Sequence, residues 1–558
     1  MCRHLQWRAA ALVAGLTTVS GCDTPTPSPG LGPTSRASSS GTPISLMTRP
    51  EAVTPVPATA SASSSAAGGS RASDCPAHLV IPQIAEQYPA TQTYSPWRSA
   101  SPEGCPKLED VSDLAVGDVD GDEVPEIVFS SLKIEHTKGL YVMRRKADDA
   151  TWGCPEPLRV SQPVTRVAIA DLERDNVPDV VAASSCGGHP CLLKIEAKSD
   201  AEPSTLFEQA GASTGANATD FRIADLNQDG VLDIAVSVAL LQNPDRPFAP
   251  LVLTGRLEGG SWRPTVMALA QKLTHGFAVE IGTFAGDGGL GLLFGGTRER
   301  SDASAQQRQP VGMLTIPDTI SWQTYAVETQ ASGKSEAPRW VIDFALGTAS
   351  AEVGLTSAHS HCTGSNEHPY ACTPDAASEL QDITVTTRPT TARRLAKENG
   401  EWKSLVYLGP NRWAVGFEET KAYSKFGSCK LQRAPGGVLL VDKPGSQPTS
   451  QIPGRAISVQ DLAVVSLRSR AQQDELRVPA RKGAQTAAYP LNFAPTLRCG
   501  GNPTKVPGLT WVPESRLVTI PELPSPCPNA ELSYPADKRP VLVALDRKGD
   551  GVFVSEPR

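Results

Sequence analysis

Three acidic segments of nine residues carry the side chains best suited to chemistry in this sequence. They start at residues 118, 171 and 225, and each places oxygen-bearing side chains at positions 1, 3, 5 and 9. With a backbone carbonyl near position 7, these would surround a hard cation, and calcium prefers six to eight oxygen ligands at about 2.3–2.6 Å. We therefore expect three calcium sites. The ligands would be Asp118, Asp120, Asp122 and Glu126, then Asp171, Glu173, Asp175 and Asp179, then Asp225, Asn227, Asp229 and Asp233.

An EF-hand, a magnesium site and a set of acidic turns are the alternatives to a nine-residue calcium loop of this kind. An EF-hand requires a bidentate glutamate at position 12 and flanking helices, but position 12 is Phe129 in the first segment and Val236 in the third. Magnesium fits less well because it keeps several waters in a strict octahedron. Acidic β-turns, whose side chains only accept backbone hydrogen bonds, remain open. In a calcium loop or an acidic turn, Gly121 and Gly230 permit the positive φ of a tight loop.

The segments belong to a repeat that also predicts the elements around them. Their starts are 53 and 54 residues apart, and each lies between short apolar runs rich in valine and isoleucine, which predict strands. Residues 283–291 keep the frame, but Thr283 and Ala285 replace carboxylates, and we expect no ion there. Fainter copies follow at 340–355, 405–415 and 457–465, and residues 541–554 predict an outer-strand hairpin that completes the last unit.

This periodicity predicts the fold. The 47 glycines and 49 prolines punctuate the chain, and helix signals are sparse. Units of about 50–60 residues, each with a few strands and tight turns, are typical of propeller blades. One blade cannot bury both of its faces, whereas a closed ring of blades can. We therefore predict an all-β fold, a β-propeller of seven blades, over residues 74–558.

The nine-residue pattern followed by Ile-Val or Val-Val resembles the FG-GAP/VCBS repeat of integrin α-chain propellers and bacterial surface proteins. The match is specific over residues 113–240 and weaker from residue 276 onward. The resemblance implies a seven-bladed propeller whose calcium ions stiffen loops on one face and perform no chemistry. It supports the twelve ligands given above. After the third repeat this chain departs from the family pattern, because the carboxylates are lost.

The N-terminal residues predict a signal peptide, a lipid anchor and a linker. Residues 1–21 combine a basic start with a short apolar run, as in a signal peptide. Val19–Cys22 resembles the bacterial lipobox, so we expect Cys22 to carry the lipid anchor. Residues 22–73 are rich in Pro, Ser, Thr and Ala, too polar to offset their ordering entropy, and predict a disordered linker. The expected location is the bacterial cell envelope, with the membrane bound through the lipid.

The cysteines agree with export. Of the 12, ten remain without Cys2 and Cys22, and an even number in an exported chain predicts disulfides. Local spacing favours three pairs: Cys186 with Cys191, Cys362 with Cys372, and Cys499 with Cys527. His359, His361 and His368 beside the second pair are an alternative zinc cluster, but a disulfide with surface histidines is the favoured interpretation.

Two classes of function fit this sequence. A net charge of −7 without a basic tract argues against nucleic acid as a partner. No nucleophile elbow, phosphate loop or zinc-protease motif occurs. We therefore expect a binding or scaffold module for an envelope protein or glycan, with calcium as its cofactor. The alternative is an envelope enzyme of the polysaccharide lyase or hydrolase type at the central channel mouth. A cluster of Arg, His, Tyr and Glu there would favour the enzyme.

Overall fold

The fold is known from a computed structural model. The chain divides into two units, Met1–Ser70 and Arg71–Arg558, and all described residues belong to the second. The expected signal peptide, Cys22 and the linker therefore lie outside the described residues. The structure describes residues 89–108, 111–131, 139–145, 152–197, 202–209, 216–240, 248–269, 273–283, 290–298, 310–315, 323–328, 340–346, 352–358, 377–384, 393–399, 402–410, 412–417, 420–421, 433–434, 436–442, 449–468, 472–491, 493–547 and 551–558.

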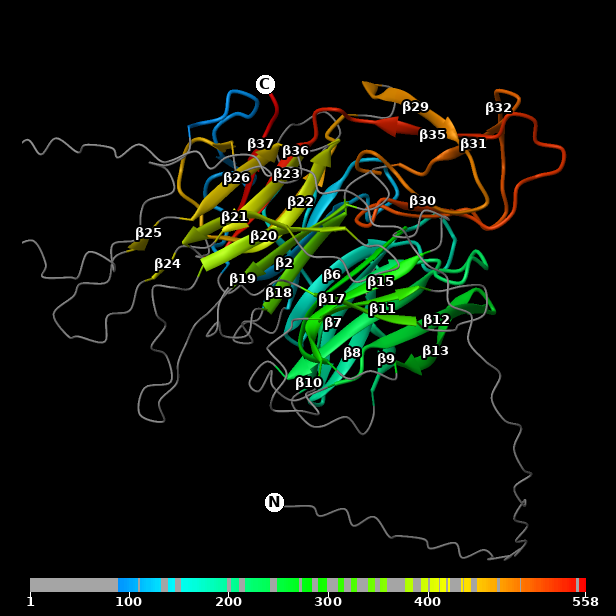
Figure 1. Cartoon of the computed structure of the whole chain (residues 1–558), viewed down its shortest axis with the longest axis horizontal. Coiled ribbons are helices and arrows are strands. Elements are labelled where there is room, and N and C mark those ends of the chain that lie inside the picture. The colour runs from blue at the N-terminus through cyan, green and yellow to red at the C-terminus, as the bar shows by residue number, and fades with distance from the viewer. Residues whose placement is uncertain are drawn as a thin grey trace, which may run out of the picture. The chain divides into compact units, whose positions relative to one another are not determined.

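The first three sheets are built from consecutive antiparallel strands, so that each repeat of the sequence forms one sheet (Figure 1). Sheet one contains β2 (Val111–Gly117), β3 (Glu126–Ser131), β4 (Leu140–Met143) and β5 (Glu156–Leu158). Sheet two contains β6 (Val164–Ala170), β7 (Asp179–Cys186), β8 (His189–Ile195) and β9 (Ser204–Glu208). Sheet three contains β10 (Ala216–Ala224), β11 (Asp233–Leu240), β12 (Leu251–Glu258) and β13 (Ser261–Ala268).

The next three sheets follow the same order with longer connections. Sheet four contains β14 (Leu273–Gly282), β15 (Gly291–Arg298), β16 (Pro310–Thr315) and β17 (Gln323–Glu328). Sheet five contains β18 (Trp340–Leu346), β19 (Glu352–Ala358), β20 (Ala377–Thr384) and β21 (Arg393–Asn399). Sheet six contains β22 (Trp402–Gly409), β23 (Arg412–Phe417), β26 (Gly437–Asp442) and β27 (Ser450–Gln451), with the small hairpin of β24 (Thr420–Lys421) and β25 (Arg433–Ala434) between β23 and β26.

Sheet seven joins the two ends of the described chain. It contains β28 (Val459–Val465), β36 (Val541–Asp546), β37 (Gly551–Ser555) and β1 (Arg98–Ser99), in that order. Residues 541–554 form the expected hairpin, but its second strand is not outermost, because β1 pairs along it with Arg98 opposite Val554. Arg98 also forms an ion pair with Glu556. The sequence prediction missed this strand, since two residues carry no periodicity.

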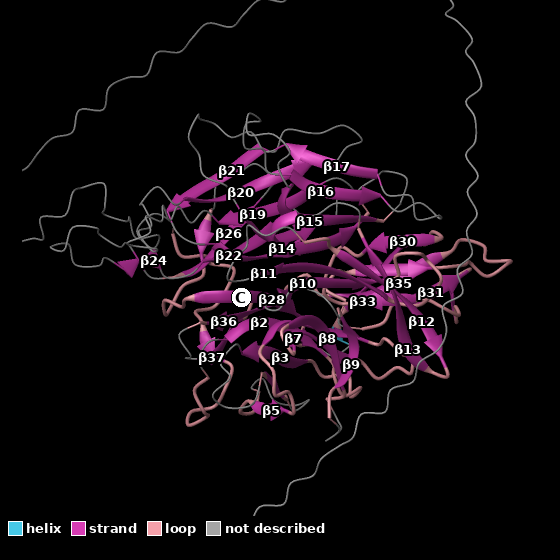
Figure 2. Cartoon of the chain, turned by 90° about the horizontal axis from the view of Figure 1, so that it is seen from below, coloured by secondary structure: helices cyan, strands magenta, loops and turns pink. Residues whose placement is uncertain are grey.

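The first strands of the seven sheets contact one another in a closed circle, in the order β2, β6, β10, β14, β18, β22, β28 and back to β2. Figure 2, which shows the chain turned by 90°, colours almost all of its described elements as strands. Among the described residues there is no α-helix, and no helix has the length and apolar character needed to cross a membrane. The protein is therefore an all-β propeller.

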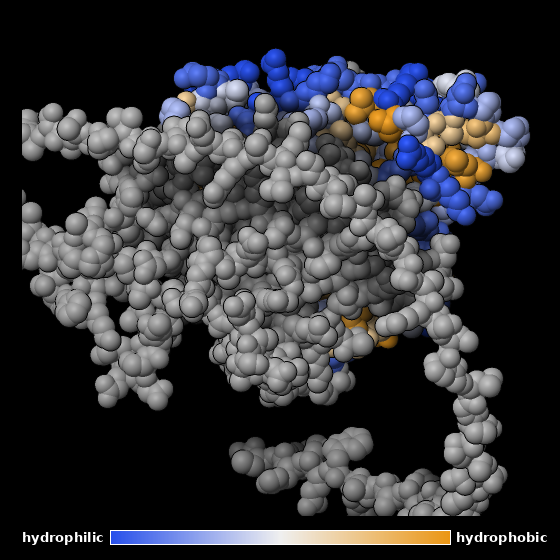
Figure 3. Space-filling model, viewed as in Figure 1, coloured by the Kyte–Doolittle hydropathy of each residue, from blue (hydrophilic) through white to orange (hydrophobic). Residues whose placement is uncertain are grey.

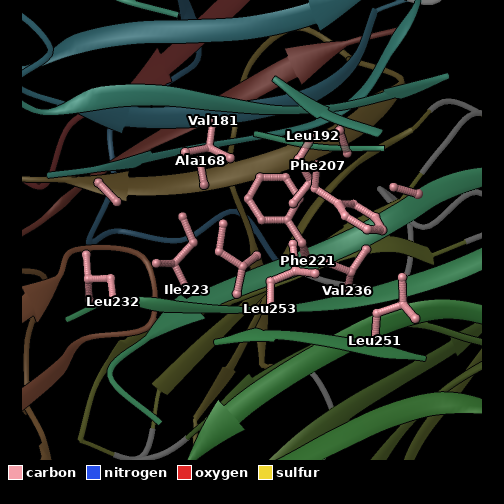
Figure 4. Close-up of a cluster of buried hydrophobic side chains, with 14 of the residues drawn as sticks. Ala168, Val181, Leu192, Phe207, Phe221, Ile223, Leu232, Val236, Leu251 and Leu253 are labelled. Carbon is pink, nitrogen blue, oxygen red and sulfur yellow. The ribbon is translucent and has the colours of Figure 1, made fainter. Parts of the chain in front are cut away.

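Apolar side chains between neighbouring sheets hold the ring together. Figure 4 shows the core between sheets two and three, where Val181, Leu192 and Phe207 face Phe221 and Leu253. Phe221 is 1% exposed, and truncating such a side chain to alanine costs about 3–5 kcal/mol. Because the strands of each sheet are buried on both faces here, they appear in the sequence as continuous apolar runs.

An inserted region between β28 and β36 was not predicted. It contains β29 (Asp474–Pro479), β30 (Gly483–Thr486), β31 (Thr496–Cys499), β32 (Asn502–Thr504), β33 (Thr510–Val512), β34 (Leu517–Ile520) and β35 (Glu531–Ala536). These strands form two small sheets, in the orders β29-β35-β31-β32 and β30-β34-β33. They enclose a separate apolar core that includes Leu497, Val518 and Leu532. The connection from first to second strand, eight residues long in the early repeats, is therefore a folded subdomain here.

Candidate metal site and axial cavity

The three acidic segments share one backbone conformation. We call them loop one (Asp118–Glu126), loop two (Asp171–Asp179) and loop three (Asp225–Asp233). Each connects the first strand of its sheet to the second, and position 9 pairs with the residue before position 1, as Glu126 does with Gly117. Positions 4 and 6 have positive φ in all three loops. These residues are Gly121 and Glu123, Arg174 and Asn176, and Gln228 and Gly230.

Loop one brings three carboxylates together. Ligand oxygens of Asp118, Asp120 and Glu126 all lie within 4.8 Å of one another. Two oxygens on opposite sides of a calcium ion, each at about 2.4 Å, are separated by about 4.8 Å, so this donor set fits calcium in both chemistry and spacing. Burial raises the pKa of Glu126 to about 8, against the hydrogen bond donated by the Val119 amide. Asp122 is not part of the group and accepts from the Val124 amide instead.

Asp118 organises the backbone of loop one. Its Oδ1 accepts hydrogen bonds from the amides of Asp120, Gly121 and Asp122, and its Oδ2 accepts from Glu123 at 2.9 Å. An aspartate at position 1 therefore shapes the turn whether or not an ion is bound. This agrees with both sequence-based interpretations of the segment, since it makes the acidic turn and leaves oxygens clustered in its centre.

Loop two contains a built-in cation. Nζ of Lys194, which is 9% exposed, lies 2.7 Å from Oε2 of Glu173 and 3.5 Å from Oδ1 of Asp179. Burial raises the pKa of Asp179 to about 7, and Lys194 opposes that shift. Asp171 and Asp175 accept backbone hydrogen bonds as in loop one. The ammonium group thus pairs with the carboxylates of positions 3 and 9, which are two of the four calcium ligands expected in this loop.

In loop three, the side-chain oxygens accept hydrogen bonds from backbone amides, and the loop lies against the inserted region. Asp225 accepts from Asp229 and Gly230, while Asp233 accepts from Leu226 and Gly255. Burial raises the pKa of Asp225 and of Asp233 to about 7. Asn227 accepts from the Asp229 amide and donates to its carboxylate.

Loop three also needs glycine at position 6 for a steric reason. A Cβ on Gly230 would lie 2.9 Å from Cα of Gly508, which belongs to the inserted region. The same region approaches position 4, where a Cβ on Gly483 would lie 3.3 Å from Oε1 of Gln228. Position 1 of the fourth repeat, Thr283, lies 3.3 Å from Thr486 between hydroxyl oxygens, and Ala285 lies outside the described residues.

The described cysteines form three disulfides. Cys186 is joined to Cys191 and Cys499 to Cys527, the pairings that their spacing favours. A third bond, between Cys105 and Cys154, links residues 49 apart and was left open by the sequence. Cys362, Cys372 and the three neighbouring histidines lie outside the described residues.

A second group of charged residues surrounds the propeller axis, and it was not predicted from the sequence. The first strands of five sheets each place a polar side chain beside a β-bulge. Each of these side chains accepts a hydrogen bond from a backbone amide on the first strand of the next sheet in the ring. The donors and acceptors are Leu114 to Asp461, Val167 to Asp113, Val279 to Asp220, Leu405 to Asp343 and Leu462 to Ser404. These bonds link neighbouring sheets around the ring.

Two arginines balance most of these acids. Arg166 forms ion pairs with Asp113 and, at 2.7 Å, with Asp220. Arg222 lies 2.9 Å from Asp220 and 3.6 Å from Glu280. Burial raises the pKa of Asp343 to about 7, although both arginines oppose the shift. A signal for this group exists in the sequence, because Asp113, Arg166 and Asp220 each stand five residues before their loop, but no ligand motif accompanies it.

The inserted region covers the axis. The turn between β33 and β34, residues Pro513–Arg516, reaches the ring of first strands, where the guanidinium of Arg516 lies 4.1 Å from the ring centroid of Tyr407. Between this turn and the first strands is a cavity of about 150 Å³, which we call the axial cavity. The charged residues of its lining are Asp113, Arg166, Arg222, Glu280, Asp343, Asp461, Glu514 and Arg516.

Comparison with known proteins identifies no family. No family model and no curated protein sequence matches the chain. Among solved structures, the chain is similar to regucalcin of Agrobacterium tumefaciens, described as a calcium-binding protein, with 10% identity, a TM-score of 0.32 and coverage of 63% of this chain and 93% of that one. A quinoprotein alcohol dehydrogenase-like protein of Bacteroides thetaiotaomicron has 9% identity and a TM-score of 0.36, with coverage of 63% of this chain and 67% of that one. The Dos1 propeller has 7% identity and a TM-score of 0.37, with coverage of 66% of this chain and 90% of that one. At these identities the likeness concerns the fold alone.

Proposed function

We propose that this protein is a calcium-stabilised binding module of the bacterial cell envelope, held to the membrane by a lipid on Cys22. The observation that carries the proposal is the cluster of Asp118, Asp120 and Glu126, and the loop that holds it resembles the FG-GAP/VCBS repeat. The closed order of first strands supports a seven-bladed propeller, as that resemblance implies. The three disulfides are in keeping with export.

Calcium would act as a structural ion in this proposal. Asp118, Asp120 and Glu126 would hold it in loop one, and its charge would offset the repulsion between buried carboxylates. Loop three is the second candidate, because it keeps three carboxylates and Asn227 without a lysine among them. Loop two is the weakest, since calcium there must displace the ammonium of Lys194. We therefore expect the ions to bind in the order loop one, loop three, loop two.

Metal removal tests this proposal. Thermal unfolding of the mature protein in calcium should occur several degrees higher than in chelator, because a ligand that binds only the folded state stabilises it. Isothermal titration should give a stoichiometry that falls by one in an Asp120→Ala variant. An unchanged midpoint in the two buffers would remove the calcium claim and leave all three loops as acidic turns.

Surface presentation supports a binding role for the inserted region. In Figure 3, hydrophilic side chains predominate around β29 and β35, with smaller hydrophobic areas between them. On β29, exposed Asp474, Glu475 and Arg477 alternate with half-buried Leu476 and Val478. A mixed surface of this kind suits an envelope protein or a glycan. Affinity capture from an envelope extract, compared with a variant that lacks the inserted region, would test the binding role. Lipid labelling that is lost in Cys22→Ala would test the anchor.

An enzyme is the second candidate, and one observation favours it. Arg166, Arg222, Tyr407, Glu280 and Glu514 converge at the axis, as the sequence analysis required of an enzyme, although no histidine is among the lining residues. The turn of the inserted region lies over the same place, which argues against a polymeric substrate. Turnover of envelope polysaccharides by the wild-type protein, abolished in Glu514→Gln, would decide in favour of the enzyme.

A further inference from the structure

One of the three disulfides lies at the end of a hairpin that the backbone already holds closed. β7 and β8 pair in register up to Cys186 opposite His189, and Gly187 and Gly188 form the turn between them with φ of 58° and 87°. Positive φ at both central residues belongs to the two-residue turn that best fits the twist of a hairpin. Cys186 and Cys191 would therefore stay adjacent without a covalent bond between them.

This disulfide also constrains little of the unfolded chain. Its cysteines are 5 residues apart in sequence, against 49 for Cys105–Cys154 and 28 for Cys499–Cys527. In the chain-entropy model, a disulfide stabilises a protein more as the loop that it closes becomes longer. Among the described disulfides, Cys186–Cys191 therefore contributes least to stability by this route, and the fold has the least need of it.

Three side chains of this hairpin share one face of sheet two. Cys186 lies directly opposite His189, and Cys191 is two residues further along β8, so the three side chains project to the same side. Cys191 is 0% exposed and belongs to the apolar core between sheets one and two. Cys186 and His189 are half-buried, so solvent approaches the disulfide on the Cys186 side.

His189 has an imidazole nitrogen without a partner. Its Nδ1 is buried and makes no hydrogen bond with any described residue. A buried polar atom without a partner lowers stability, and a redox or catalytic role is one of the few reasons for keeping one. Histidine is also the side chain that takes up and releases protons near neutral pH. On the same face as a half-buried disulfide, this imidazole can give a proton to a sulfur that leaves the bond.

We propose that Cys186–Cys191 is a thiol–disulfide exchange site, which a dithiol reduces while the propeller stays folded and His189 supplies a proton. A thiolate of the dithiol attacks Sγ of Cys186, so that a mixed disulfide forms and the bond to Cys191 breaks. The electron pair of the broken bond goes to Sγ of Cys191. That sulfur takes the proton of His189, because a thiolate in the apolar core would be costly.

A second exchange completes the reaction. The other thiolate of the dithiol attacks the dithiol's own sulfur in the mixed disulfide, which releases Cys186 as a thiolate that takes a proton from solvent. The dithiol is oxidised to a disulfide, and the same two electrons reduce the protein bond to two thiols. Because the hairpin keeps these thiols adjacent, an excess of another disulfide reverses the reaction. The hairpin and loop two lie at opposite ends of sheet two, so this site is independent of calcium.

Reduction of the full mature protein by dithiothreitol at about pH 7 tests the proposal. Acid stops the exchange, the free thiols are alkylated, and mass spectrometry gives the rate of opening at each described disulfide. Cys186–Cys191 should open while the thermal unfolding midpoint stays within a few degrees, and it should close again in oxidised glutathione. His189→Gln should slow this opening about 100-fold, the lower end of what a general acid contributes, and leave the rates at Cys105–Cys154 and Cys499–Cys527 unchanged.

Ser185→Ala is the matched control, because Ser185 belongs to the same hairpin but lies opposite Pro190 on the other face, and its opening rate should equal that of the wild type. If His189→Gln alters folding, His189→Ala provides a second variant, in which imidazole added to the buffer should restore part of the rate. The proposal is wrong if the bond opens only as the protein unfolds, if both His189 variants open at the wild-type rate, if imidazole has no effect on a slowed His189→Ala, or if Ser185→Ala is slowed equally.

Discussion

Loop one and loop two have the same backbone conformation, but only in loop two does a described cationic side chain pair with the loop carboxylates. Both have positive φ at positions 4 and 6, and both use the aspartate at position 1 to accept amides of the turn. In loop two, Lys194 of β8 reaches the carboxylates, whereas in loop one the three carboxylates face one another. Lys194 pairs with Val181, and the corresponding residue of sheet one is Val142, opposite Val128. Under the proposed calcium function, this one side chain on a neighbouring strand decides which of the two loops takes an ion from solution.

The largest expected effect comes from removing the built-in cation. Lys194→Met keeps the length of the side chain but leaves Glu173 and Asp179 without a partner, so the free energy of unfolding in chelator should fall by about 3 kcal/mol. Calcium should restore part of that loss, because loop two then resembles loop one. Denaturant unfolding with and without calcium measures both effects. Lys482→Met, on an exposed lysine, should change neither; a loss that calcium cannot restore would refute the comparison.

The next largest effect separates the contribution of the turn to stability from the contribution of a bound ion. Asp118→Asn removes a charge from the cluster and replaces the oxygen that accepts the Glu123 amide, so stability in calcium should fall by about 2 kcal/mol. The thermal shift on adding calcium should shrink as well. Asp171→Asn is the matched control in loop two, expected to cost a similar amount while leaving the calcium shift unchanged. Equal loss of the calcium shift in both variants would contradict the proposed difference between the loops.

A smaller effect tests the shared backbone. Gly121 has a φ of 72°, so Gly121→Ala should cost about 1 kcal/mol through left-handed backbone strain. Arg174 occupies the same position in loop two with a φ of 61°, so the strain is tolerated there. Calcium affinity of Gly121→Ala should stay within a few-fold of wild type. A large loss of affinity would mean that the two backbones respond differently.

The smallest effect extends the contrast to the axis, where Asp343 lies 3.7 Å from Arg222, whereas Glu514 forms no ion pair with a described residue and is influenced by Arg222 and Arg166 only from a greater distance. The folded-state pKa of Glu514 is raised from 4.5 to about 7, so the folded state binds the proton more tightly than the unfolded state. Its contribution to stability is therefore fully present below about pH 4.5 and is lost as pH rises to about 7. Glu514→Gln should flatten that part of the unfolding-midpoint profile relative to wild type and to Glu522→Gln. Parallel profiles would show that Glu514 does not titrate in this range.

The sequence predicted the features that lie close together along the chain. Asp118 and Glu126 belong to one turn, and the apolar runs on either side determine the strands that hold it, so spacing alone located loop one. Lys194 stands 15 residues after Asp179, at a position defined only by the register of β7 and β8. Cys105–Cys154 and the axial acids are likewise brought together by the ring, for which no local pattern exists.

The inserted region and strand β1 also show the difference between features that are local in the sequence and features that the fold brings together. The last repeat has a connection that is too long for a turn, which signals an insertion, but nothing in residues 466–540 indicates that it folds over the axis. Glu514 has no neighbouring motif, and its environment comes from strands far earlier in the chain. Local reasoning therefore found the candidate metal site and missed the axial cavity.

The closure of sheet seven sets the order in which the protein can be completed. Arg98 pairs with Val554, so the outermost strand, formed from the first part of the propeller, has no partner until almost the last residue has been released. Closing so long a stretch of chain is entropically costly and slow. Sheets one to six contain only residues that follow one another, so they can assemble before the rest of the chain is available. A chain that stops before β37 leaves β1 without its partner strand and sheet seven with only β28 and β36, whatever the quality of its earlier sheets.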